Sequence, residues 1–307
     1  MKKLMPEAYE ERFLDKAQKS ISIRLTEPKD LRLPERAARS HKYTVGRAVV
    51  VAGAEGYSGA PVLAANACER SGAGLTQLLV PRSIYPIAAI KCDGTVVTPI
   101  EADQSGAFAR SAVRTVMEHV KKADACLVGP GIGLGDGARA IVAQILRDAA
   151  CPVILDADAI TIASAHPWLL EKSRAPLVLT PHEGEFKRIG GSLENGRLAG
   201  AAAFARAYDP VTLVLKGFGT LVCRAQELSV NPTGSAALAK GGSGDVLSGL
   251  LCALLAQGLD PLQSAQTAAY LHGLAGDLAA EALGMYSVTP SDVIRYLPEA
   301  FKTVSQK

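Results

Sequence analysis

The chain has 307 residues, of which 48% are hydrophobic and 5% aromatic, and its formal net charge at pH 7 is +3. So small a positive charge argues against nucleic acid as a partner, and no window reaches the roughly 18 apolar residues that would span a membrane. The N-terminus lacks the apolar core of a secretory signal and the six cysteines are scattered, so we expect a cytoplasmic protein with reduced thiols.

The first 40 residues are rich in charge, with a helical stretch near Pro6–Ser20 and proline breaks at Pro28 and Pro34. We interpret residues 1–40 as an amphipathic helical lead-in that packs on the main domain or on a neighbouring subunit. No repeat, low-complexity tract or linker interrupts residues 41–307. We therefore predict one catalytic domain over that range.

From Arg47 onward, short apolar runs alternate with glycine turns and segments of helical length. Continuous Val, Ile and Leu runs are typical of strands buried on both faces of a parallel sheet, and they fall at residues 48–51, 75–80, 125–128, 152–155, 177–179 and 211–215. Helical patterns fall at residues 60–71, 108–121, 138–149 and 246–281. This order predicts an α/β fold, a mostly parallel sheet with helices on both faces, and ligands at the carboxyl ends of the strands.

The most informative segment is the glycine-rich sequence Lys240-Gly241-Gly242-Ser243-Gly244-Asp245, which an apolar helix follows. Such a turn presents unpaired backbone N–H groups and the positive end of the helix dipole to an anion. A carboxylate beside a phosphate is unfavourable unless it moves a proton or holds a metal. The segment therefore indicates phosphoryl chemistry, and the alternative is a structural turn in which Asp245 only caps the helix.

Two other strands run into glycine turns. The first turn is Ala52–Pro61, and the second is Gly129-Pro130-Gly131-Ile132-Gly133, whose small residues would leave backbone amides open to an anion. Neither is a dinucleotide fingerprint, because Asp136 stands where the third glycine would be, and no P-loop sequence occurs. Either turn alone is equally consistent with a structural role.

Carboxylates and a histidine follow two further strands. Asp156-Ala157-Asp158 could hold Mg²⁺ through water or cap a helix, and we favour a capping or supporting role for Asp158. Thr180 or Pro181 would open the next helix, so that His182 and Glu185 share its first-turn face. This pair could bind a polar substrate and a hydrated metal; the alternative is a capping carboxylate beside a surface histidine. We interpret His272, inside a helical stretch, as a satisfied core histidine.

The last predicted strand leads into Lys216-Gly217-Phe218-Gly219-Thr220 and then into a return strand. A lysine and a threonine that bracket a tight turn can hold phosphate oxygens by charge and by hydroxyl donation. The alternative is a hairpin with an ordinary surface lysine.

In their order, these segments resemble the ADP/ATP-dependent NAD(P)H-hydrate dehydratases, a family with the ribokinase-like fold. The similarity runs from about His41 to Leu283, and Thr-Pro-His-x-x-Glu with the later Gly-Gly-x-Gly-Asp best separates this family from other ribokinase-like kinases. The stretches that carry it are His41-Lys42, Tyr57–Pro61, Ser71–Leu75, Gly129–Gly133, Leu155–Ala159, Thr180–Glu185, Lys216–Thr220 and Gly241–Asp245.

The resemblance implies that the chain dehydrates the S-epimer of hydrated NADH or NADPH back to the reduced cofactor. The ring hydroxyl is a poor leaving group, and its phosphorylation, by ADP with release of AMP or by ATP, would turn it into a good one. Mg²⁺ would accompany the nucleotide. The resemblance also implies a homo-oligomer, since bacterial members are commonly tetramers.

The resemblance also assigns the site residues by position. Asp245 would be the general base, and the amides of Gly242 and Gly244 would stabilise the transferred group. Glu185 would position the metal through water. The nucleotide would contact Lys216, Gly217, Phe218, Gly219, Thr220 and Gly244. The hydrate would contact Ala60, Gly131, Gly133, His182 and Asp245.

Two stretches depart from the family pattern. Ser235–Lys240 stands in place of Asn-Pro-Gly-x-Ala-Thr, so that Lys240 adds a charge near the phosphates and bears on the choice between ADP and ATP. Ala52-Gly53-Ala54 replaces Gly-Gly-Ser. The epimerase domain fused to many bacterial members does not fit into a 40-residue lead-in, so we expect the chain to act on one epimer.

Two other functions are consistent with the same segments. A ribokinase-like kinase of a small vitamin-precursor alcohol, of the thiazole or pyrimidine type, needs the same anion site and base but stops at the phosphate ester. A non-catalytic nucleotide sensor would respond to its ligand unchanged after Asp245→Asn.

Overall fold

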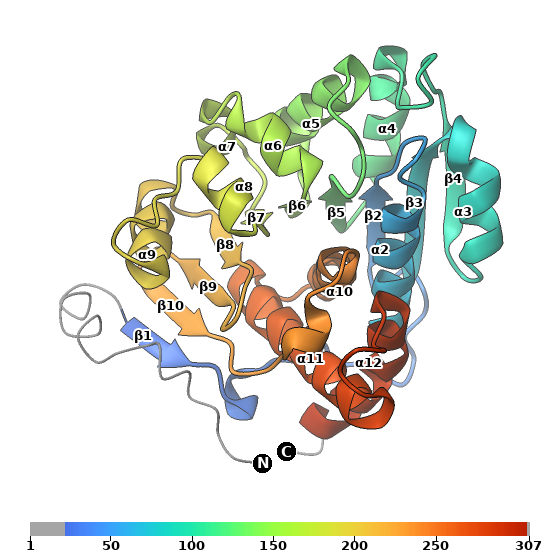
Figure 1. The fold of residues 1–307 in the computed structure, drawn as a ribbon. Helices are drawn as coiled ribbons and strands as arrows, with labels where there is room; N and C mark the ends of the chain where they lie inside the picture. Colours follow the sequence, from blue (N-terminus) through green and yellow to red (C-terminus); the bar gives the residue numbers. More distant parts are fainter. Residues whose placement is uncertain (1–21, 306–307) are drawn as a thin grey trace.

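A ten-stranded sheet runs through residues 22–305, the part of the chain that the computed structural model describes (Figure 1). The strand order is β1-β10-β9-β8-β7-β6-β5-β2-β3-β4. The strands are β1 (Ser22–Leu25), β2 (Arg47–Val51), β3 (Leu75–Pro81), β4 (Val96–Ile100), β5 (Ala125–Val128), β6 (Val153–Leu155), β7 (Leu177–Leu179), β8 (Thr212–Leu215), β9 (Leu221–Arg224) and β10 (Glu227–Val230).

Within this sheet only β9 runs against the others, because it pairs antiparallel with both β8 and β10 while the remaining pairings are parallel. β2 lies between β3 and β5, so the chain builds outward to β4 and then returns to continue on the other side of β2. A crevice opens at such a switch in direction, outside the carboxyl ends of the two strands. Here those ends are Val51 and Val128.

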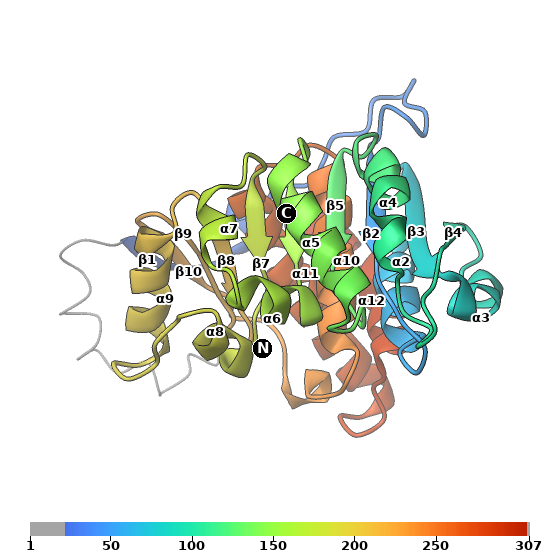
Figure 2. The ribbon, with the colours of Figure 1, turned by 90° about the horizontal axis from the view of Figure 1, so that it is seen from above.

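Helices cover both faces of the sheet (Figures 1 and 2). One face carries α4 (Val113–Val120), α5 (Asp136–Asp148), α6 (Asp158–Ser164), α7 (Trp168–Glu171), α8 (Glu183–Arg188) and α9 (Arg197–Ala207). The other carries α2 (Gly59–Arg70), α3 (Tyr85–Lys91), α10 (Ser243–Ala256), α11 (Pro261–Leu283) and α12 (Pro290–Ser305). Short 3₁₀ turns occupy Pro28–Asp30, Arg82–Ile84, Arg110–Ala112 and Ala236–Leu238.

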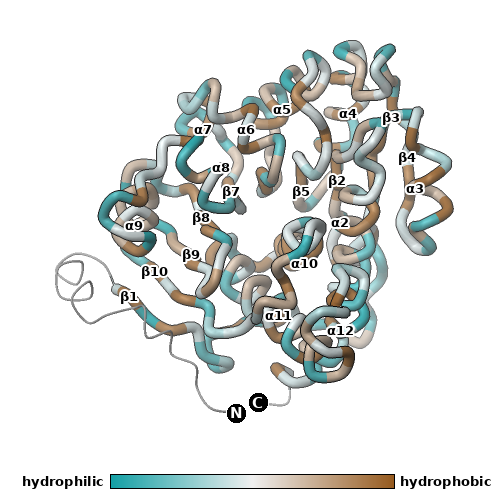
Figure 3. Tube along the Cα trace, viewed as in Figure 1, coloured by the Kyte–Doolittle hydropathy of each residue, from teal (hydrophilic) through white to brown (hydrophobic). Residues whose placement is uncertain are grey.

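The continuous apolar runs explain why both faces are buried. Along β2, Val49 and Val51 belong to one core, whereas Ala48 and Val50 belong to the other, since successive side chains of a strand point to opposite faces. Figure 3 shows the inner strands and the helix sides facing them as largely apolar. All six cysteines are buried in these cores as free thiols, as predicted. The mostly parallel α/β fold is confirmed.

The predicted helix boundaries shift in two places. The segment 108–121 begins with the 3₁₀ turn Arg110–Ala112 before α4, and the segment 246–281 divides into α10 and α11. Residues 22–25 of the lead-in form β1 at one edge of the sheet, paired with β10. The helical stretch predicted near Pro6–Ser20 lies outside the described residues, and the domain boundary after residue 40 stays a prediction. None of the described helices is long and apolar enough to cross a membrane.

α10 packs closely on α2 at Gly249. A Cβ atom added there would lie 2.1 Å from the Ala64 carbonyl oxygen, so a hydrogen side chain is needed for the two helices to approach. The packing sets α10 beside β2 and β5, the two strands at the switch in strand direction (Figure 1).

Candidate active site

The amino end of α10 is a glycine turn with free backbone amides. Gly242, its N-cap, has φ +97°, and a Cβ there would meet Leu63 and Pro290, so only glycine fits without strain. The Ser243 amide donates to the Lys240 carbonyl at 3.3 Å. The amides of Gly244 and Asp245 have no backbone acceptor in the described structure, and Gly242 has no capping side chain. These two N–H groups are therefore available to an anion.

Asp245 lies in this first turn, and its carboxylate makes no hydrogen bond or ion pair with residues 22–305. The pKa of Asp245 is raised to about 7: burial contributes most, the charges of Asp156 and Asp158 add to the rise, and Lys216 opposes it. An unpaired carboxyl group with a pKa near neutrality can accept a proton at physiological pH. The geometry supports the base predicted for this position rather than a cap.

Lys216 and two carboxylates form a compact charged cluster next to α10. Its Nζ atom lies 2.9 Å from Asp156 Oδ1 and 3.9 Å from Glu185 Oε2. A Cβ atom added at Gly244 would lie 3.3 Å from the same nitrogen, so the ammonium sits directly beside the first turn of α10. Burial lowers the pKa of Lys216, but the charges of Asp156 and Glu185 outweigh that effect and leave it raised. Lys216 is thus a partly buried cation beside the first turn of α10, not an ordinary surface lysine.

His182 and Glu185 lie together at the start of α8, where they form a capping box, as in the alternative of a capping carboxylate beside a surface histidine. The His182 Nδ1 atom accepts from the Gly184 and Glu185 amides at 3.0 and 3.2 Å, and Glu185 Oε2 accepts from the His182 amide at 2.9 Å. Consequently α8 begins at Glu183 with His182 as its N-cap, and the predicted start at Thr180 or Pro181 is two to three residues early. The His182 Nε2 atom faces Glu185 Oε1 at 3.4 Å, and the side chain is 59% exposed, open to a ligand.

The Gly129–Gly133 turn is less open than expected. The Ile132 amide donates to the Gly129 carbonyl at 3.1 Å, and the Gly133 amide donates to Asp158 Oδ2 at 2.9 Å. The Gly129 amide also donates, to the Val51 carbonyl at 3.2 Å, so three of the amides predicted to face an anion are already bound. Asp158 does not cap α6, whose N-cap is Ala157 without a side-chain bond; it supports this turn instead.

Ala60 lies beside Gly131, on the amino end of α2. A Cβ atom added at Gly131, whose φ is +60°, would lie 2.9 Å from Tyr57 Cβ and 3.4 Å from Ala60 Cβ. The two glycine turns thus meet, and Leu63 of the same helix touches the Gly242 position. Ala60 and Gly131, two of the residues predicted to hold the hydrate, therefore lie together on the side of α2 that meets α10.

The Lys216–Thr220 turn joins β8 to β9 in the predicted hairpin. Thr220 Oγ1 donates to the Gly217 carbonyl at 3.1 Å, and Phe218 is 65% exposed. Arg197, which the sequence did not point to, holds the turn from α9: it donates to the carbonyls of Phe218 at 2.6 Å, Lys216 at 3.1 Å and Leu215 at 3.2 Å. An arginine at the start of an alanine-rich helix carries no signal of this role.

Two further side chains near α10 depart from expectation. Lys240 Nζ donates to the Tyr286 carbonyl at 2.7 Å and forms no ion pair among the described residues. His272 is buried, but its Nε2 atom has no hydrogen-bond partner within residues 22–305, so this ring nitrogen is not satisfied as predicted. Burial lowers the pKa of His272 to about 4, with the Ser243 backbone opposing the shift and Lys216 adding to it.

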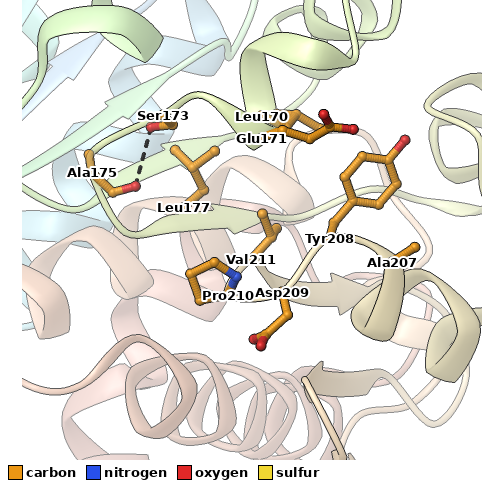
Figure 4. Close-up of a pocket in the computed structure, with 10 residues that line it drawn as sticks. All are labelled: Leu170, Glu171, Ser173, Ala175, Leu177, Ala207, Tyr208, Asp209, Pro210 and Val211. Carbon is orange, nitrogen blue, oxygen red and sulfur yellow. Dashed lines mark hydrogen bonds between the residues drawn. The ribbon is translucent and has the colours of Figure 1, made fainter.

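A separate cavity of about 110 Å³ lies away from these residues (Figure 4). It is lined from the amino ends of β7 and β8, by Leu177, Tyr208, Asp209 and Val211 among others. Ligands of parallel sheets bind at the carboxyl ends of strands, where Asp156, His182 and Lys216 follow β6, β7 and β8. The carboxyl edge is therefore the candidate active site.

Residues 48–299 match the model of a protein family described as NAD(P)H-hydrate dehydratase. The chain belongs to this family. It is 35% identical over 280 residues to the bifunctional NAD(P)H-hydrate repair enzyme of Moorella thermoacetica, which covers 90% of this chain and 53% of that protein. The chain thus spans about half the length of the bifunctional relatives it matches.

Relatives of similar length also match. The ADP-dependent (S)-NAD(P)H-hydrate dehydratase of Listeria monocytogenes is 31% identical, over 89% of this chain and 94% of that one. The Bacillus subtilis ADP/ATP-dependent dehydratase of the family, co-crystallised with ATP and Mg²⁺, has a TM-score of 0.76 at 28% identity, over 92% of this chain and 99% of that one. A ribokinase-like superfamily protein of Enterococcus faecalis has a TM-score of 0.81 at 29% identity, over 93% and 97%. The ribokinase-like fold is confirmed.

Proposed function

We propose that the chain is a nucleotide-dependent dehydratase of hydrated NADH or NADPH, acting on the S-epimer. The observation that carries this proposal is the unpaired carboxylate of Asp245, with its pKa near 7, in the same helical turn as two free backbone amides. A base and an anion site must lie this close if a hydroxyl is to attack a phosphorus atom. Family membership supports the hydrate as the alcohol.

In the proposed reaction, the Asp245 carboxylate takes the proton of the ring hydroxyl as its oxygen bonds to the terminal phosphorus of ADP or ATP. The bond from phosphorus to the nucleotide breaks, and AMP or ADP leaves. The ring nitrogen lone pair then expels phosphate, and loss of a proton from the adjacent carbon restores the dihydropyridine. The amides of Gly244 and Asp245 stabilise the charge on the transferred group, with the Gly242 amide beside them.

We assign the two ligands to opposite sides of α10. Lys216–Thr220 would hold the nucleotide, because the hairpin brings the Lys216 ammonium to Gly244. Ala60, Gly131, Gly133 and His182 would hold the hydrate. The Gly133 amide is engaged by Asp158, so we expect its contribution to come from the shape of the turn.

Mg²⁺ fits the carboxyl edge as an ion held by the nucleotide rather than by the chain. No group of three or more His, Cys, Asp or Glu residues in the described structure is arranged to hold a metal. Mg²⁺ is commonly bound by one or two carboxylates, by waters and by substrate phosphates, so the Glu185 carboxylate would serve through water. When bound, the ion would neutralise phosphate charge. A cytoplasmic location and a homo-oligomer, of which a tetramer is one form, stay predictions.

The proposal is tested by incubating the purified chain with NADH hydrate, Mg²⁺, and ADP or ATP in turn. We expect reduced-nicotinamide absorbance to return only when hydrate and nucleotide are both present, and the effective nucleotide to identify the donor. Accumulation of a phosphate ester without that absorbance would identify a kinase of the vitamin-precursor type instead. Omission of Mg²⁺ is expected to abolish turnover.

A further inference from the structure

Asp156 is a buried carboxylate whose partner is at the active site. Its residue is 1% exposed, and Oδ1 lies 2.9 Å from Lys216 Nζ. Removing two charges from water is costly, so a buried pair of this kind is weak evidence for stability. The pair does fix the position of the Lys216 ammonium, because the lysine side chain is flexible and its charged end stays at the carboxylate that binds it.

The backbone around Asp156 is itself held in place. Its amide donates to the Val128 carbonyl at 3.2 Å, and its Oδ1 atom accepts from the Ala157 amide at 3.0 Å. Ala157 has φ +48°, a conformation that a residue with a Cβ seldom adopts. The Asp156 carbonyl would lie 1.9 Å from a Cβ at Gly129, so the segment also presses against the neighbouring turn. Strain held this firmly at a strand end is typical of a functional constraint.

Several groups could attract the Lys216 ammonium. Glu185 Oε2 is 3.9 Å from Nζ, and the Asp245 carboxylate also acts on Lys216 electrostatically. Without Asp156, the ammonium would be drawn toward Glu185, which already lies within 3.9 Å, and would leave its present place beside Gly244. Asp156 is therefore the group that determines where this positive charge stands relative to an incoming phosphate.

We propose that Asp156 is a positioning residue for phosphoryl transfer, which holds the Lys216 ammonium beside the amides of Gly244 and Asp245. The inference rests on the proposed function for its catalytic consequence, but the placement of Lys216 can be tested alone. Asp158 stands two residues away and supports Gly133 instead, so it provides a matched control.

The same carboxylate acts on the proposed base. The charged groups that shift the pKa of Asp245 are Asp156, Lys216 and Asp158, and Asp156 is the largest of these after burial. Removing the charge of Asp156 should lower that pKa. The acid limb of the profile of kcat/KM against pH should therefore move to lower pH in Asp156→Asn, a change that a merely structural role would not produce.

The test combines kinetics with structure. Asp156→Asn keeps the acceptor for the Ala157 amide, and we expect it to lower turnover about 100-fold at a pH well above 7, where Asp245 is ionised in either form. If Asp156 acts through Lys216, adding Asp156→Asn to a Lys216→Met chain should lower turnover little further. If instead the loss of turnover in the double variant equals the product of the two single losses to within about twofold, the inference is overturned. For Asp158→Asn and Lys216→Met, by contrast, we expect the loss of turnover in the double variant to equal the product of the two single losses. Thermal unfolding of each variant shows whether it folds.

Crystal structures of the wild-type and Asp156→Asn chains provide the readout that does not depend on turnover. We expect Lys216 Nζ to move by more than about 1 Å in Asp156→Asn and to stay in place in Asp158→Asn, a displacement large enough to impair catalysis. An unmoved Nζ would overturn the inference whatever the activity. A wild-type chain that does not restore NADH would contradict the proposed function and leave this structural comparison to decide the inference.

Discussion

Replacing Asp245 with Asn should remove activity and increase stability at the same time. The change keeps the shape of the side chain but removes both the base and the charge. General bases contribute about 10²- to 10⁴-fold, so we expect kcat to fall by that factor while nucleotide binding persists. Because the pKa of Asp245 is about 7, kcat/KM of the wild-type chain should rise with pH through that value.

The stability gain follows from the same pKa. The rise from 3.8 to about 7 means that the folded chain holds this proton more tightly than the unfolded chain does. Stability therefore falls as pH rises from about 4 to 7, and above pH 7 the ionised carboxylate costs at most about 4 kcal/mol. Asp245→Asn escapes this cost, so its gain should be present above pH 7 and vanish below pH 4.

The assay measures turnover of NADH hydrate, nucleotide binding by calorimetry and urea unfolding at several pH values. Asp148→Asn makes the same chemical change at a side chain that is 46% exposed and far from the cluster, and it should alter none of the three. Turnover of Asp245→Asn within tenfold of wild type would refute the assigned base. A loss of stability at high pH would refute the electrostatic reasoning.

Three further changes test other parts of the site. His182→Ala should chiefly raise KM for the hydrate, and it should lower the free energy of unfolding by about 1 kcal/mol because the helix cap is lost. His182→Asn should keep the stability. A selective loss of nucleotide affinity would instead assign His182 to the nucleotide site. Lys240→Thr should raise the KM for the nucleotide about tenfold, more for ATP than for ADP, and weaken the dependence of that KM on salt concentration, because an ammonium that forms no ion pair is removed. Identical initial rates of the variant and the wild-type chain at all salt concentrations would contradict this role. Gly249→Ala should lower the free energy of unfolding by about 2 kcal/mol or more, because its Cβ would meet the Ala64 carbonyl at 2.1 Å; an unchanged urea midpoint would be the contrary result.

The fold was predictable because each level of the sequence pointed the same way. The apolar runs over residues 125–128 and 177–179 became β5 and β7, since strands buried on both faces need unbroken apolar sequence. The antiparallel β8–β9 hairpin followed from the glycine turn at Gly217 and Gly219. Strand order and the edge position of β1 have no local signature, because they depend on which distant segments pair.

The candidate site was predictable in its members but not in its connections. Motifs pointed to Asp245, His182, Glu185 and Lys216, and the structure brings them to one edge. That Lys216 pairs with Asp156 could not be read from the sequence, since the residues are 60 positions apart. For the same reason the sequence left a capping and a supporting role open for Asp158, and the structure shows the supporting one, to the amide of Gly133 on the neighbouring turn.

The most direct test of the central claim follows the oxygen atom of the substrate hydroxyl. NADH hydrate prepared in water enriched in oxygen-18 carries the label on the ring, and the chain is given this substrate with Mg²⁺ and the effective nucleotide. If the hydroxyl is phosphorylated before it leaves, the label appears in inorganic phosphate, one atom for each nicotinamide restored. Label found in water, with the nicotinamide restored, would contradict the account.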